Sequence, residues 1–132
     1  MRLTHLWNKL WPQQQRAEQR LQNITIVVSS LAASEIKTQI QYAQNACNAF
    51  SAAKEHGNAP TVNALRDLSD RITMSLRAIA LQKKILRAVN PALVEEIHQR
   101  HHAEWAVVES VHCEIGNAIR ANAQPEPPPP TR

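Results

Sequence analysis

The sequence Gly-Asn-Ala-Pro at residues 57–60 separates two long segments that contain almost no helix-breaking residues. Between residues 13 and 121 the only other glycine or proline residues are Pro91 and Gly116. A Gly inside a helix costs about 1 kcal/mol and a Pro about 3 kcal/mol, so segments without them form helices readily. This spacing predicts an all-α fold in which long helices are joined by turns at residues 57–60 and 90–91.

We expect an elongated antiparallel bundle of three helices, at about residues 13–56, 61–89 and 91–121. Gly57 suits the left-handed position that ends the first helix. Asn90 suits the N-cap of the third helix, with Pro91 at its first position. Residues 122–132 form a proline-rich tail, which we expect to be extended or disordered.

Residues 1–12 are predicted to form a short amphipathic helix of their own. The apolar residues of this segment recur at the i, i+3, i+4, i+7 and i+8 spacing, which places them on one helix face. They are Leu3, Leu6, Trp7, Leu10 and Trp11. Pro12 either ends this short helix or opens the next one.

The apolar stripe of the first long helix begins with Leu21, Ile24 and Val28. The run Ile-Thr-Ile-Val-Val at residues 24–28 would favour a strand if it stood alone. Helix-forming residues flank it, however, and the sequence offers no second strand for pairing. Antiparallel pairing with the shorter second helix would leave residues 13–26 projecting by about 20 Å. This uncovered apolar end predicts a docking surface.

The composition suits a single domain of 132 residues with one core. Aromatic residues make up only 4% of the chain, so Leu, Ile, Val and Ala have to build most of that core. The formal net charge of +4 is spread unevenly, because basic residues dominate residues 71–87 and acidic residues dominate residues 92–120. These segments fall on neighbouring antiparallel helices, so much of the charge can be compensated within the molecule.

Cysteine usage and hydropathy indicate the compartment. Cys47 and Cys113 belong neither to a CxxC pair nor to a disulfide framework, so we expect two reduced thiols in a cytoplasmic protein. The longest apolar run, residues 24–33, is far shorter than the roughly 20 residues that cross a bilayer. Integral membrane insertion is therefore not expected.

The third helix contains the residues most able to bind a metal ion. His98 and His102 stand four residues apart, and Glu95 lies on the same flank, which is a spacing that can serve one metal ion. No fourth ligand is evident, and solvated histidines on an acidic helix are the plainer interpretation. No nucleophile arrangement or phosphate-binding loop stands out. We expect no enzymatic activity, no cofactor and no metal.

Four basic residues could form a stripe that contacts nucleic-acid phosphates. They are Arg77, Lys83, Lys84 and Arg87. Almost no aromatic residues are interleaved with them for base stacking, and no helix-turn-helix is recognisable. A small basic accessory subunit of a nucleoprotein complex, contacting the nucleic-acid backbone, is therefore the alternative function.

The function that we favour is a non-enzymatic helical subunit for protein–protein interaction or assembly. It would associate with itself as a homo-oligomer or dock on a larger complex. The expected interface residues are Leu3, Leu6, Trp7, Leu10, Trp11, Leu21, Ile24 and Val28. The tail also matches a PxxPxR ligand at residues 127–132, but a run of four prolines produces such matches by chance.

Overall fold

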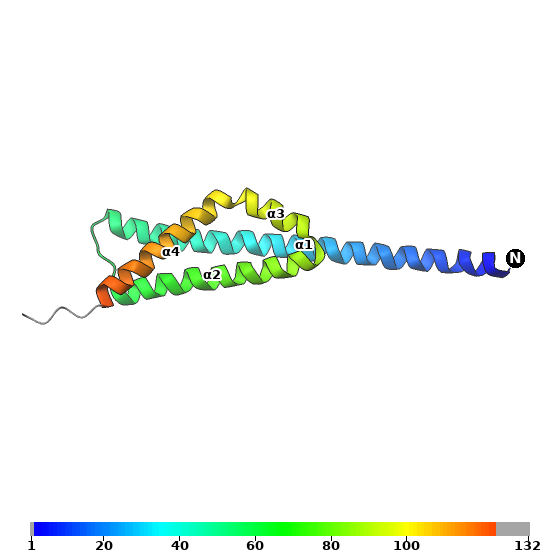
Figure 1. Ribbon diagram of the computed structural model, residues 1–132, viewed down its shortest axis with the longest axis horizontal. Coiled ribbons are helices and arrows are strands. Elements are labelled where there is room, and N and C mark those ends of the chain that lie inside the picture. The colour runs from blue at the N-terminus through cyan, green and yellow to red at the C-terminus, as the bar shows by residue number, and fades with distance from the viewer. Residues whose placement is uncertain (1, 124–132) are drawn as a thin grey trace, which may run out of the picture.

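The computed structural model describes residues 2–123, with the side chains of residues 2–11 and of Ala123 outside the description. The expected all-α class is confirmed, and residues 2–123 contain no strand. Four helices follow one another along the chain (Figure 1). They are α1 (Arg2–Glu55), α2 (Val62–Val89), α3 (Pro91–Arg100) and α4 (His102–Ala123). None of them carries an apolar stretch long enough to cross a membrane within the described part of the chain.

Helix α1 runs without interruption from Arg2 to Glu55 and contains Pro12. The separate helix expected over residues 1–12 is therefore part of α1. Pro12 lacks an N–H and its ring crowds the preceding turn, which weakens a helix at that point. No glycine and no other proline lies near it, however, so the flanking residues continue the helix on both sides. The expected proline-rich tail, residues 122–132, lies outside the described residues from 124 onward.

The turn after α1 is formed at Gly57, as the sequence predicts. Gly57 has a φ of 69°, in the left-handed region where a side chain would be strained. The amide of Asn58 donates to the carbonyl of Ala53 at 3.2 Å, and the amide of Gly57 donates to Lys54 at 3.1 Å, which together form a Schellman cap. Thr61 then caps α2, since its hydroxyl accepts from the amide of Ala64 at 3.1 Å.

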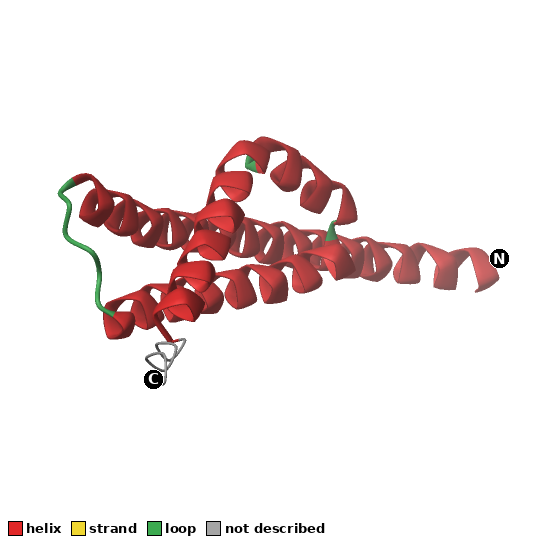
Figure 2. Ribbon diagram, turned by 60° about the vertical axis from the view of Figure 1, so that its left-hand side comes forward, coloured by secondary structure: helices red, strands yellow, loops and turns green. Residues whose placement is uncertain are grey.

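The expected single helix over residues 91–121 is divided into α3 and α4 at His101. Neither Gly nor Pro stands there. The backbone bends at His101, which has φ −106° and ψ 14°. The reason lies in the packing: α3 lies over one end of the α1–α2 hairpin, whereas α4 crosses it obliquely toward the start of α2 (Figures 1 and 2). A single straight helix could not pack along the direction of α3 and along the direction of α4.

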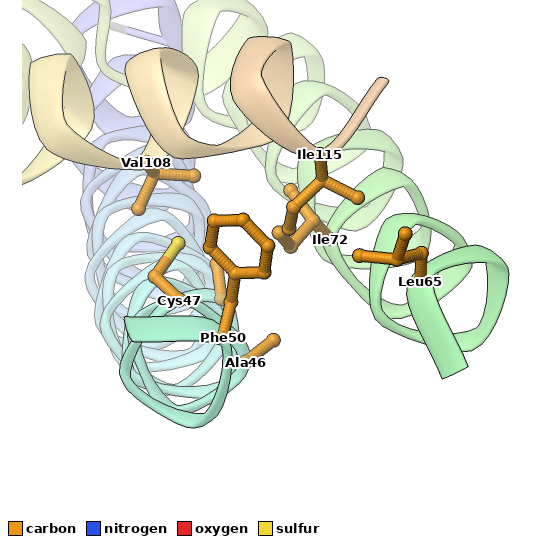
Figure 3. Packing of buried hydrophobic residues seen from close by; sticks show 8 residues of the cluster. Ala46, Cys47, Phe50, Leu65, Ile72, Val108 and Ile115 are labelled. Carbon is orange, nitrogen blue, oxygen red and sulfur yellow. The ribbon is translucent and has the colours of Figure 1, made fainter. Parts of the chain in front are cut away.

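The core consists of two clusters along the hairpin. Near the Gly57 turn, Phe50 packs with Leu65, Ile72, Val108 and Ile115 (Figure 3). At the other end a second cluster joins α1, α2 and α3, and its members are Ala32, Ile36, Ile40, Ile79, Leu86, Val94 and Ile97. Helix α2 supplies both clusters, because its fully buried residues recur every seven positions. This repeat keeps one face of α2 against the core along its whole length.

Truncating the centre of this face tests the packing. We expect Ile72→Ala to lower the free energy of unfolding by about 2–5 kcal/mol, because Ile72 is fully buried and a cavity would remain. Met74→Ala, two residues away on an exposed position, should change it by less than about 0.5 kcal/mol. Urea unfolding followed by circular dichroism measures both, and equal effects would contradict the described core.

The junction between α2 and α3 gives a second test. The amide of Asn90 donates to Leu86 at the end of α2, and its side-chain oxygen accepts from the amide of Leu93 at 3.3 Å. Asn90→Ala removes the cap of α3 and should cost about 1 kcal/mol of stability in the same urea assay. Asn63→Ala, at an exposed position in the first turn of α2, serves as the control and should cost less.

Candidate interaction surface

The first half of α1 extends beyond the other helices as a free rod, which we call the overhang and define as residues 2–28 (Figure 1). No residue from 12 to 28 is buried, and among the described side chains of α1 the first buried one belongs to Ser29. At 1.5 Å per residue the overhang is about 40 Å long. It is longer than the projection expected over residues 13–26, because α1 already begins at Arg2.

The overhang and its base expose large apolar side chains. Leu21 is 65% exposed, Ile24 is 59% exposed and Leu31 is 67% exposed. Together with the half-buried Val28 they form a stripe with intervals of three, four and three residues, which we call the α1 seam. The buried face of α1 instead passes through Ala32 and other core residues. The structure therefore separates two faces that the sequence analysis treats as one stripe.

Along the bundle the same side of α1 borders a groove that it shares with α2. The groove has a volume of about 540 Å³. Its lining residues are Gln39, Tyr42, Asn45, Ala46 and Ala49 of α1 and Arg71, Met74 and Ser75 of α2. Tyr42 and Met74 are more than half exposed. Since α3 and α4 contribute nothing to the lining, the groove is a place where a further helix could lie against the hairpin.

The structure places the expected interface residues in two groups. Leu21, Ile24 and Val28 lie on the α1 seam as described. The other five, Leu3, Leu6, Trp7, Leu10 and Trp11, belong to the first turns of α1, but their side chains lie outside the described residues. The groove was not expected from the sequence, because its existence depends on which side of the hairpin α4 covers.

Of the four basic residues of the alternative function, Lys83 makes a contact within the protein. Lys83 is turned toward the core, and its Nζ lies 4.3 Å from the centre of the Trp105 ring. Burial lowers the pKa of Lys83, the charge of Arg87 lowers it further, and Glu109 raises it. A cation over an aromatic face is a packing contact. Arg77, Lys84 and Arg87 are exposed and remain able to meet phosphates.

The histidines of α3 and α4 make contacts within the protein. His101 Nδ1 lies 2.9 Å from Glu104 Oε2, and His112 Nε2 lies 3.2 Å from the hydroxyl of Thr73. The rings of His98 and His102 meet edge to face with centroids 6.1 Å apart. Among the side chains of residues 12–122 no three His, Cys, Asp or Glu are close enough together to hold a metal ion.

Comparison of the chain with protein-family models, with curated proteins and with solved structures finds no match.

The two cysteines provide a test of the α1–α4 contact. Cys47 is buried in the core, and burial raises the pKa of its thiol, so little thiolate forms at pH 8. Cys113 is exposed. We expect one maleimide to add quickly at Cys113, and a second to add at Cys47 only in urea, as read by intact mass and peptide mapping. Fast labelling of Cys47 in the native protein would show that α4 does not cover it.

Proposed function

We propose that this chain is a non-enzymatic helical assembly subunit that docks through the overhang, either on another protein or on a second copy of itself. The observation that carries the proposal is the exposure of Leu21, Ile24 and Leu31 on a helix that extends past its own bundle. A water-exposed helix gains little stability without an apolar face packed against another element. A partner would supply that contact.

Burial of the exposed α1 seam residues in an interface would contribute to the free energy of binding. Full burial of one Leu or Ile side chain stabilises by about 1.5–3 kcal/mol. The exposed residues of the α1 seam could therefore contribute several kcal/mol per chain, of which part offsets the loss of freedom on association. Micromolar affinity requires about 8 kcal/mol in total. The exposed residues of the α1 seam alone fall short of this total, so a stable interface needs further apolar contacts along α1.

The charged groups of the bundle fit a structural role. Lys54 of α1 pairs with Glu114 of α4, and Arg100 pairs with Glu96 on α3 at 2.8 Å. These pairs are exposed, and such pairs contribute little to stability, roughly 0–1 kcal/mol each. We infer no catalytic step at them. The free Cys47 and Cys113 suit a reducing compartment, and we propose the cytoplasm.

Charge placed on the seam should abolish docking. We expect the double variant Leu21→Glu, Ile24→Glu to lose association, because carboxylates would have to be desolvated in an apolar contact. Both positions lie outside the bundle, so far-UV circular dichroism should show that the helices remain. Sedimentation velocity over a concentration series measures self-association, and affinity capture with mass spectrometry measures binding of other proteins.

Gln19→Glu is the matched control, since it adds a negative charge to an exposed residue on the opposite face of the same helix. It should leave association unchanged. A wild-type chain that sediments as a monomer at all concentrations, and that captures nothing the double variant fails to capture, would refute the assembly function.

A further inference from the structure

We propose that the partner is a second copy of this chain, and that the two α1 helices pair antiparallel so that each overhang lies in the α1–α2 groove of the other copy. This inference rests on the proposed assembly function and specifies its partner and geometry. The overhang and the groove would then be two halves of one interface, which a two-fold axis repeats.

The first support is the spacing of the α1 seam. Starting at Leu3, alternating steps of four and three residues lead through Leu21, Ile24, Val28 and Leu31 and end at Ala49. Alternation of four and three is the spacing of a coiled-coil seam. Most positions on this face of α1 are apolar, and the polar exceptions are Gln14, Glu35, Thr38 and Asn45. The α2 helix covers a different face. A helix of the same length can therefore lie along α1 from end to end.

The second support is the length of the two parts. Helix α1 has 54 residues, and the overhang takes up half of them. The remaining half lies within the bundle and borders the groove. When two such helices run antiparallel about a central two-fold axis, each overhang is alongside the bundle half of the other, and neither is left uncovered.

The third support is the register. In an antiparallel pair, one alignment of the two α1 helices brings the large apolar residues of both seams together. It places Leu21 opposite Leu31 of the second copy and Ile24 opposite Val28 of the second copy. A shift of seven residues in one direction brings Ile24 against Glu35, and a shift in the other direction brings Leu31 against Gln14. The apolar residues of the seam thus select one register.

The same register brings the first turns of the overhang alongside the groove. The seam positions Leu10, Trp7 and Leu3 come opposite Tyr42, Asn45 and Ala49 of the second copy. Those three residues line the groove. The side chains of residues 2–11 are not described, so this pairing follows from their positions along α1. The groove lining includes Ala46 and Ala49, small residues against which a helix can approach closely.

The charges favour the antiparallel direction. The overhang carries four basic residues and one acidic residue, Glu18. Parallel pairing would lay two such segments side by side, and like charges across a coiled coil repel. Antiparallel pairing in this register lays each overhang along residues 24–50 of the other copy, whose charged residues are Glu35 and Lys37, one acidic and one basic.

Disulfide trapping tests the pairing in the full-length chain. Leu21→Cys and Leu31→Cys are made separately in a Cys47→Ala, Cys113→Ser background, mixed, and oxidised gently. We expect the mixed 21–31 disulfide to exceed either symmetric disulfide by at least tenfold, as read by non-reducing electrophoresis and peptide mass spectrometry. Gln19→Cys mixed with Leu31→Cys is the control, because residue 19 is on the opposite face of α1, and it should give little product.

The alternative outcomes are distinguishable. A predominant 21–21 disulfide would show a parallel pair and overturn this proposal. A monomer in sedimentation with no disulfide above the control would also overturn it. If that monomer still captures another protein in a manner lost in Leu21→Glu, Ile24→Glu, the assembly function stands and only the identity of the partner is wrong.

Discussion

The packing of α2 against α1 is the contact on which every other part of this molecule depends. Leu65, Ile72, Ile79 and Leu86 are almost completely buried and recur every seven residues, so one face of α2 stays in the core over its full length. Both core clusters include residues from this face. Helices α3 and α4 are shorter, and each adds to a hairpin that α1 and α2 already define.

The overhang is a consequence of unequal lengths in this hairpin. Helix α1 has 54 residues and α2 has 28, and Asn90 with Pro91 ends α2 sharply. Helix α3 then turns back along the bundle, so no later segment among the described residues accompanies the first half of α1 (Figure 1). The exposed apolar residues Leu21 and Ile24 nevertheless continue the helix pattern into this half. The combination of a long helix, a short companion and apolar residues beyond it is the basis of the proposed assembly function.

The sequence predicted those parts of the fold that local chemistry decides. Gly57 and Asn90 are at their turns because a left-handed residue and a side-chain cap are needed there, and the projection of α1 followed from helix lengths. The bend at His101 could not be predicted, since it arises from packing α3 and α4 on two separate clusters. Nor could the position of Lys83 over Trp105, which links residues distant in sequence. The groove depends likewise on which face α4 leaves open, so only half of the candidate surface was accessible from sequence.

Ser29 marks the place where α1 leaves the bundle, and its buried hydroxyl has no hydrogen-bond partner among the described residues. The helix passes this place without a loop. The overhang therefore continues the helix of the bundle directly. The direction in which each of its side chains faces is set by the number of residues between that side chain and Ser29. Insertion or deletion of one residue between 12 and 28 would rotate the far end by about 100° and shift it by about 1.5 Å. A change of seven residues would instead return the far end to within about 20° of its original facing, while it would shift that end by about 10 Å.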